Sequence, residues 1–147
     1  MNLFSILALL AGATIATQAS MNARLGVLLS SPLLGTAIAF AFSCLFTVIA
    51  VIAFNPKAPS MGQIQAVPVY LWFSGGMLAA FGVGLFYFLI PKMGIGAMMS
   101  YALTGQLLVA IIASHFGWFD LPTRPINLTR ALGVIALALG ILLINGD

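Results

Sequence analysis

The chain has 147 residues, of which 63% are hydrophobic and only 5% are charged, with a formal net charge of +3. About a quarter of the residues in soluble domains are charged, so this composition excludes a soluble globular protein and indicates an integral membrane protein. The basic residues stand singly at the ends of apolar runs: Arg24, Lys57, Lys92, Arg124 and Arg130. A nucleic-acid-binding protein would cluster its cations, so we expect no nucleic-acid partner and interpret these residues as membrane topology signals.

Five apolar segments are long enough to cross a bilayer, which takes about 20 mostly apolar residues. They cover residues 3–29, 33–54, 69–90, 94–118 and 128–145. We therefore predict an all-α integral membrane protein with a single domain of five transmembrane helices, residues 1–147. The first 20 residues end in small residues that a signal peptidase could cleave, but they lack a basic start and the apolar run resumes at residues 25–29, so we expect a retained first transmembrane helix.

The first segment carries polar side chains at intervals of four residues, which places Thr14, Gln18 and Asn22 on nearly one helix face. Polar groups in hydrocarbon cost free energy unless they meet partners or a watery cavity. A carboxamide has more donors and acceptors to satisfy than a hydroxyl has. We therefore predict that Gln18 and Asn22 line a cavity, and that Thr14 bonds to a neighbouring helix.

Turn and cap residues mark the connections between the segments. Two serines before Pro32 predict a helix cap with proline in the first turn, so the first two helices should form a hairpin. Residues 91–94, Pro-Lys-Met-Gly, predict the break between the third and fourth helices and a second hairpin. In the longer loop 55–68, residues 60–63 (Ser-Met-Gly-Gln) fit a capping box and predict a short interfacial helix.

The fourth segment holds further polar residues. Gln106 lies near its middle, while Tyr101 lies about 140° round the helix and is the better candidate for a pocket wall. Trp72 fits an aromatic belt at the start of the third helix or the entrance to a pocket. His115 could shuttle protons near neutral pH and is a possible coupling residue, although an interfacial histidine needs no such role. The candidate substrate-binding residues are Gln18, Asn22, Trp72, Tyr101 and Gln106.

The sequence contains no motif for catalysis or metal binding. No predicted span contains Asp or Glu, which argues against a buried carboxylate that exchanges protons for a cation. The one cysteine, Cys44, cannot form a disulfide or a thiolate metal site within one chain. A zinc-protease histidine pair, a nucleophile elbow and a glycine-rich phosphate loop are also missing. We therefore predict no enzyme activity, no catalytic residue, no metal and no cofactor.

Small residues recur every four positions in all five segments, as at Gly12, Ala16 and Ser20 in the first and Ala136 and Gly140 in the last. Such rows let helix backbones approach closely in lipid. Glycine and alanine are common in membrane helices, which explains one row alone but explains all five less well. We therefore predict a compact helix bundle.

The basic residues predict membrane orientation only weakly. Lys57, Arg124 and Arg130 fall on one side of the membrane, and Arg24 and Lys92 fall on the other. This three-to-two division permits insertion in both orientations. A five-helix chain without an internal repeat can be half of an inverted-repeat transporter only beside a second, inverted chain. We therefore predict a dual-topology antiparallel homodimer with its site at the subunit interface; the alternative is a fixed orientation with an oppositely oriented homologue.

Several of these residues together resemble the YdcZ-like family of small five-helix membrane proteins in the drug/metabolite transporter superfamily. The resemblance covers essentially the whole chain and rests on Gln18 with Asn22, Gly75-Gly76, Gly105-Gln106-Leu107, His115-Phe116-Gly117, the Pro-x-Arg-Pro turn at 122–125, and Arg130 with Gly133 and Gly140. It implies a multi-pass protein of the bacterial cytoplasmic (inner) membrane. It also implies an antiparallel two-subunit assembly equivalent to a ten-helix transporter.

The chain departs from related proteins at two places. It has Ser114 where the family often has an acidic residue, and it has Thr14 and Gln18 where small multidrug exporters use a glutamate. The resemblance therefore implies transport as a class, and proton-coupled drug export is not carried over. We predict a transporter or facilitator for a small polar or amphipathic solute, with the lipid bilayer, a second copy and the solute as partners. The rivals are a non-transporting membrane interaction subunit and half of a heterodimeric transporter.

Overall fold

The computed structural model describes residues 2–54, 58–120 and 122–146, and in these ranges all the regular structure is helical. This confirms the predicted all-α class. The chain divides into two compact units, Met1–Lys92 and Met93–Asp147. Lys57, one of the residues that predicted orientation, lies outside the described ranges.

Among the described residues, four helical segments are long and apolar enough to cross a membrane, so the protein is a multi-pass membrane protein. They are α1 (Leu3–Leu28), α2 (Pro32–Phe54), the segment Val69–Met93 and α5 (Ile95–Phe116). The remaining apolar helix, α6 (Leu128–Ile144), has 17 residues. At 1.5 Å per residue it is about 26 Å long, whereas the hydrocarbon core is about 30 Å thick. A fifth span in this shorter helix stays a prediction.

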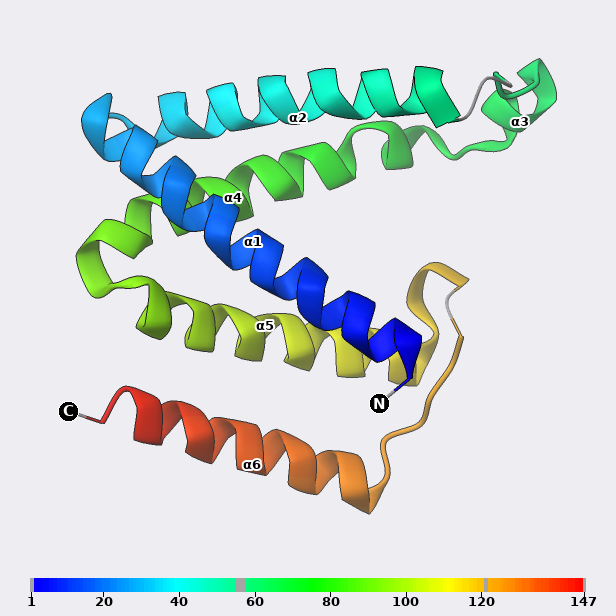
Figure 1. The fold of residues 1–147 in the computed structure, drawn as a ribbon. Helices are drawn as coiled ribbons and strands as arrows, with labels where there is room; N and C mark the ends of the chain where they lie inside the picture. The colour runs from blue at the N-terminus through cyan, green and yellow to red at the C-terminus, as the bar shows by residue number, and fades with distance from the viewer. Residues whose placement is uncertain (1, 55–57, 121, 147) are drawn as a thin grey trace. The chain divides into compact units, whose positions relative to one another are not determined.

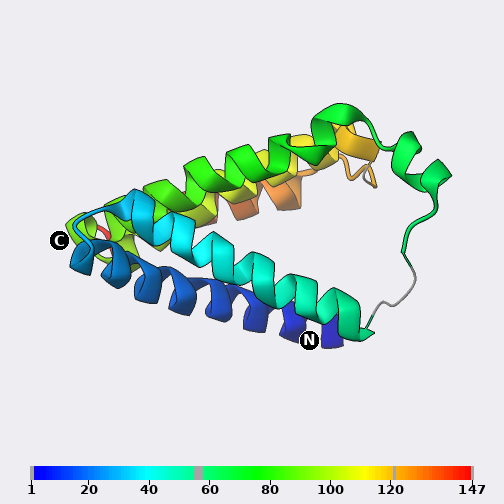
Figure 2. The same cartoon turned by 90° about the horizontal axis from the view of Figure 1, so that it is seen from above.

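Helices α1 and α2 form the predicted hairpin and run in opposite directions from a turn at Leu29–Ser31 (Figure 2). Pro32 opens α2, and the Ser31 hydroxyl accepts the Leu34 N–H at 3.2 Å, as the two serines before the proline predict. The helices touch near this turn and diverge toward their far ends (Figure 1). Their divergence leaves space between the two helices for side chains.

Two glycines allow the close contact beside the turn. A Cβ added at Gly35 would lie 3.1 Å from the Gly26 Cα and 3.1 Å from the backbone oxygen of Asn22. Because both neighbours are backbone atoms, they cannot move aside as a flexible side chain can. The approach of α1 to α2 therefore depends on the missing side chain at Gly35.

The predicted interfacial helix is present as α3 (Met61–Ala66). The Ser60 hydroxyl accepts the Gln63 N–H at 3.3 Å, and the Gln63 side-chain oxygen accepts the Ser60 N–H at 2.8 Å. These reciprocal bonds make up a capping box and satisfy two N–H groups at the start of the helix. A short 3₁₀ helix, η1 (Val69–Trp72), then leads into α4 (Ser74–Met93).

Helix α4 packs into the first unit and ends later than predicted. A Cβ at Gly84 would lie in ordinary contact, at 3.7 Å, with the Thr36 hydroxyl of α2. The predicted helix end at residue 90 is wrong, because Pro91 lies inside the last turn and the helix continues to Met93. Proline there removes one backbone hydrogen bond without ending the helix. The chain turns instead at Gly94, whose φ of +80° suits a residue without a side chain.

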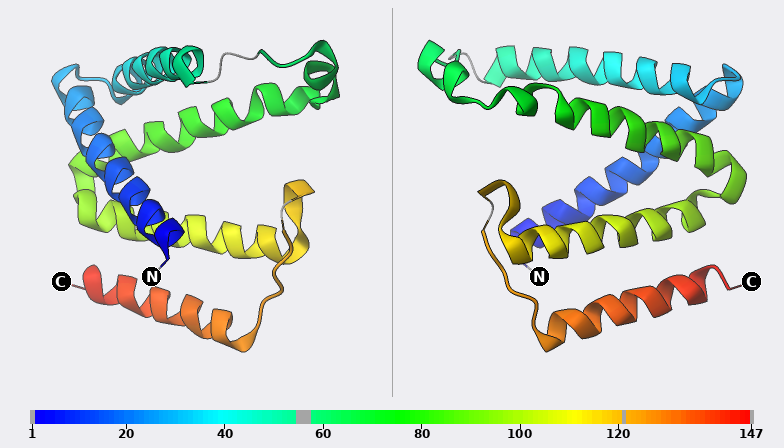
Figure 3. Two further views of the ribbon diagram at one scale, coloured as in Figure 1. Left: turned by 45° about the vertical axis from the view of Figure 1, so that its right-hand side comes forward. Right: turned by 180° about the vertical axis from the view of Figure 1, so that it is seen from behind.

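In the second unit, α5 and α6 lie side by side and run in opposite directions (Figure 3). Helix α5 ends at Gly117, which adopts the left-handed conformation with a φ of +64°. The short η2 (Trp118–Asp120) follows, and Asn127 caps α6 by accepting the Arg130 N–H at 2.9 Å. Asn145 at the other end of α6 donates its side-chain N–H to the Ser100 hydroxyl at 2.9 Å. These bonds fix the α6 cap and join the two helices at the far end.

Most of the small-residue rows make no close contact with another helix of their own unit. A Cβ added at several row positions would meet no atom within 4 Å: Gly12, Gly76, Gly96, Gly133 and Gly140. The compact bundle predicted from these rows is therefore not formed within either unit. Close helix contacts at glycine are found at the α1–α2 turn and at Gly84 in the described parts of the first unit.

Candidate functional site

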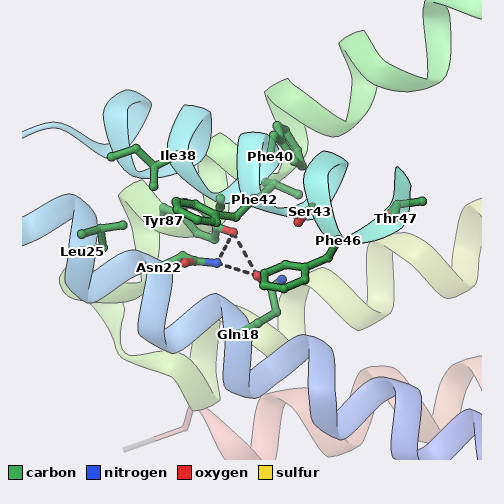
Figure 4. A pocket seen from close by; sticks show the side chains of 12 residues that line it. Gln18, Asn22, Leu25, Ile38, Phe40, Phe42, Ser43, Phe46, Thr47 and Tyr87 are labelled. Atoms are coloured by element: carbon green, nitrogen blue, oxygen red, sulfur yellow. Dashed lines mark hydrogen bonds between the residues drawn. The ribbon is translucent and has the colours of Figure 1, made fainter. Parts of the chain in front are cut away.

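Three polar side chains of the first unit form a closed ring of hydrogen bonds (Figure 4). The Asn22 side-chain nitrogen donates to the Gln18 side-chain oxygen at 2.7 Å and to the Tyr87 hydroxyl oxygen at 3.0 Å. The Tyr87 hydroxyl donates to the same Gln18 oxygen at 3.1 Å. Tyr87 is only 1% exposed. Because Gln18 and Asn22 belong to α1 and Tyr87 belongs to α4, the ring ties these helices together.

The ring uses only part of the hydrogen-bonding capacity of its two amides. Each carboxamide carries one carbonyl oxygen and one NH₂ group. The ring engages the Gln18 carbonyl and the Asn22 NH₂. The Gln18 NH₂ and the Asn22 carbonyl have no hydrogen-bond partner in the described residues. Neither group is fully buried, because no fully buried side-chain nitrogen or oxygen there lacks a partner. One donor group and one acceptor group therefore remain accessible beside the ring.

A cavity of about 670 Å³ lies beside the ring. Its walls come from the three long helices of the first unit: Gln18, Asn22, Leu25, Ile38, Ala39, Phe40, Phe42, Ser43, Phe46, Thr47, Val83 and Tyr87. This volume falls in the range of small-molecule sites, which likewise combine apolar and aromatic walls with a few polar groups. Figure 4 shows the polar ring among the aromatic side chains of α2.

The ring lies deep in the predicted membrane span. Gln18 is ten residues from the Leu28 end of α1, or about 15 Å along the helix. A hydrocarbon core about 30 Å thick places this amide near the bilayer centre. Polar groups at this depth face partners or water-filled cavities, and this ring has both a partner and a cavity.

The structure brings together two of the five predicted binding residues, Gln18 and Asn22. Trp72 lies in η1, is 63% exposed and does not line the cavity. Tyr101 and Gln106 lie on α5 in the second unit. Gln106 lines a separate apolar cavity of about 330 Å³ with Leu103, Leu107, Ala110 and Leu137. A binding role for Trp72, Tyr101 or Gln106 stays a prediction.

Thr14 does not bond to a neighbouring helix, so that prediction is wrong. Its hydroxyl donates to the Leu10 carbonyl of α1 itself at 2.8 Å. A threonine inside a helix can satisfy its hydroxyl on the preceding turn, whereas a carboxamide has too many donors and acceptors for that solution. The polar stripe therefore contributes its two amides to the site and not its threonine.

His115, the candidate coupling residue, takes part in the connection between α5 and α6. Its Nδ1 accepts the Ile126 N–H at 3.2 Å, and its ring lies edge-on to Phe116 with centroids 4.8 Å apart. Nearby, the Arg124 N–H donates to the Ser114 carbonyl at 2.7 Å. His115 thus has a structural task in the loop, and its coupling role stays a prediction.

Tyr87 belongs to the site, although the sequence pattern does not single it out. The residue stands between Phe86 and Phe88 in an apolar run, where a tyrosine resembles an aromatic packing residue. The available signal was its hydroxyl, because a buried tyrosine hydroxyl normally finds a hydrogen-bond partner. Within an apolar helix that partner comes from another helix, and the sequence does not show which helix supplies it.

The chain matches one family of known proteins. A family model described as "Putative inner membrane exporter, YdcZ" matches residues 3–143, nearly the full length. No curated protein and no solved structure gives a significant match. The description of the matched family is that of an exporter and not of an enzyme. Together with the apolar helices, the match places the protein in the bacterial inner membrane as a multi-pass protein. The chain belongs to the YdcZ-like family of the drug/metabolite transporter superfamily.

Proposed function

We propose that the protein exports a small polar or amphipathic solute, which binds in the cavity beside Gln18, Asn22 and Tyr87. The family match supports a transport role in general. The observation that carries the specific proposal is the ring, which leaves an amide NH₂ and an amide carbonyl facing accessible space. Polar residues that merely join membrane helices would be expected to satisfy one another, because spare polar groups are costly in lipid.

Transport at this site does not depend on the protonation of a buried acid. The sequence contains two acidic residues, Asp120 and Asp147, and both lie outside the predicted spans. A cation exchanger of the carboxylate type needs an acid that titrates within the membrane. The proposed site therefore binds by hydrogen bonds and apolar contact.

We further propose that the working unit is a dual-topology antiparallel homodimer in which each chain acts as one five-helix domain. This requires α6 as the fifth span, although it is only 17 residues long. Short transmembrane helices are accommodated by local thinning of the bilayer at a modest cost. Five spans place the two termini on opposite sides, and the three-to-two division of basic residues leaves both orientations accessible.

Two features of the second unit support a partner chain. Gln106 lines an apolar cavity, and its side chain makes no hydrogen bond within the described residues. A lone carboxamide in lipid is costly, and membrane helices associate through such groups. Gly133 and Gly140 on α6 also face open space in their unit, as a close helix contact with a second copy would need. A second, inverted copy would place the solute site at the subunit interface.

Transport is tested with purified protein in vesicles, screened for flux and thermal stabilisation against a library of membrane-impermeant solutes. We expect a solute that both stabilises the protein and crosses the membrane, and we expect Gln18→Met to lose that binding while the dimer persists. Gln65→Leu is the matched control, because Gln65 is exposed on α3 away from the cavity. If Gln18→Met loses the dimer and no solute is found, the polar groups serve assembly, which favours the non-transporting subunit.

Topology is tested with reporters fused to the C-terminus and read on both faces of the membrane. A dual-topology chain expressed alone reports on both sides, whereas a signal on one side contradicts the homodimer and favours a paired homologue. Adding one lysine beside Lys92 shifts a balanced chain toward one orientation and reduces flux. Co-expression of an oppositely biased copy then restores flux.

A further inference from the structure

The spare groups beside the ring define a pattern of hydrogen bonds for a ligand. The Gln18 NH₂ can donate, and the Asn22 carbonyl can accept. Turning both amides over exchanges these roles and again leaves one NH₂ and one carbonyl. A ligand that satisfies both groups must therefore present one acceptor and one donor.

The two spare groups are close enough for one small ligand. The amides are joined by a hydrogen bond of 2.7 Å. Bond lengths within an amide place its oxygen and nitrogen about 2.2 Å apart, so the free ends are at most about 7 Å apart. A single planar group whose acceptor and donor are bonded to the same carbon, as in a carboxamide, can engage either or both ends.

The cavity walls exclude a charged ligand. No Asp, Glu, Lys, Arg or His is among the lining residues. An ion that left water for this cavity would lose its hydration without gaining an opposite charge, which is strongly unfavourable. Aromatic rings attract cations, but more weakly than the cost of removing an unpaired ion from water. The site therefore favours neutral ligands.

Aromatic side chains provide contact surface for the rest of the ligand. Phe40, Phe42 and Phe46 of α2 line the cavity together with the Tyr87 ring of α4. Such rings pack well against a planar or aliphatic body. We propose that this cavity selects uncharged solutes that carry a carboxamide, or an equivalent adjacent donor and acceptor, on an aromatic or aliphatic body. Its physiological meaning rests on the proposed export function, whereas the binding itself does not.

Three probes of the same shape test this selectivity on the full-length protein: benzamide, benzoate and benzamidine. Benzamide offers one acceptor and one donor group, benzoate offers two acceptors with a negative charge, and protonated benzamidine offers two donor groups with a positive charge. Binding is measured by calorimetry or thermal shift at neutral pH. We expect benzamide to bind at least about tenfold more tightly than either ion, because each ion leaves one amide facing a like group. Equal or tighter binding of an ion, or failure of benzamide to bind, overturns the proposal.

Tyr87 is the positioning residue of this site, because its hydroxyl bonds to both amides. In Tyr87→Phe the amides are free to reorient, so the preference for benzamide over benzoate should fall, although the cost of burying the benzoate charge remains. Tyr70→Phe removes the same hydroxyl from an exposed tyrosine of η1 and should leave the preference unchanged. A preference that survives in Tyr87→Phe contradicts the positioning role. Should Tyr87→Phe fail to fold, Gln18→Met and the probe series on the unaltered protein still decide the ligand class.

Benzamide binding tests the ligand class, and solute flux tests the export function, so the two proposals can fail independently. If benzamide is selected but no library solute crosses vesicle membranes, the ligand class stands and the export function fails. If a charged solute is exported and benzamide does not bind, the export function stands and the ligand class fails.

Discussion

Both units are built from apolar helices, yet they use their polar side chains differently. In the unit Met1–Lys92, two amides and a phenol bond across helices and keep spare groups beside a cavity of about 670 Å³. In the unit Met93–Asp147, most polar side chains bond to nearby backbone or to one another. The contrast shows that a polar residue in a membrane helix indicates a binding site only when its hydrogen-bonding capacity exceeds what its neighbours use.

In the second unit, polar side chains use their hydrogen-bonding groups on nearby backbone and side chains. One Arg130 nitrogen donates to the carbonyls of Arg124 and Pro125, at 2.7 and 3.3 Å. The Asn145 amide donates to the Ser100 hydroxyl and to the Ile141 carbonyl. These bonds hold the loop and the end of the hairpin. The Gln106 side chain makes no such bond within the described residues, and it is the residue for which we propose a partner chain.

The largest expected effect concerns the contact that shapes the first unit. Gly35→Ala places a Cβ 3.1 Å from backbone atoms of α1, so the helices must separate at their turn. We expect the free energy of unfolding to fall by about 1–3 kcal/mol, the usual cost of overpacking. Equilibrium unfolding in mixed micelles measures this change. Gly75→Ala, with no atom within 4 Å of its Cβ, is the control and should be nearly neutral.

A second prediction separates folding of the chain from its assembly. Gly140→Leu fills open space on α6 and should leave the folded chain intact while it weakens the proposed dimer at least about tenfold. Ala138→Leu places the same side chain about 160° round the helix from Gly140 and should not affect the dimer. Dissociation is measured by energy transfer between labelled copies. A Gly140→Leu dimer as tight as the unaltered one would exclude this α6 face from the interface.

A matched pair of asparagine variants compares the two units directly. Asn22→Leu removes two hydrogen bonds of the ring, and Asn145→Leu removes the bond between α6 and α5. Each substitution removes one side-chain hydrogen bond between helices, which contributes about 0.6 kcal/mol on average, so we expect each variant to lose about that much stability from its interhelical bond. Only Asn22→Leu should abolish benzamide binding. Loss of binding in both variants would mean that the units do not divide their tasks in this way.

The smallest expected effect is at His115. His115→Gln keeps a polar side chain near the Ile126 N–H, and flux should change less than about twofold with or without a proton gradient. Flux assays in vesicles with an imposed pH difference provide the measurement. Flux that requires the gradient and disappears in this variant would show that the histidine couples transport to protons.

Much of the helical architecture follows from the sequence, because its causes are local. Apolar segments of sufficient length predict membrane helices, and the serines before Pro32 and at Ser60 predict their caps from neighbouring residues alone. The spacing of four residues likewise places Gln18 and Asn22 on one face of α1. The motifs distributed along the chain carry the family resemblance that the family match confirms.

Only the tertiary structure decided which polar groups meet. Tyr87 is 65 residues from Asn22 along the chain, and no periodicity relates a phenol on one helix to an amide on another. The glycine rows show the same limit, because any small residue permits close approach, but the actual contacts depend on how neighbouring helices cross. Within the first unit, Gly35 contacts backbone while Gly12 faces open space. The sequence therefore determined the helices and one amide face, and the packing of α2 and α4 around that face created the cavity.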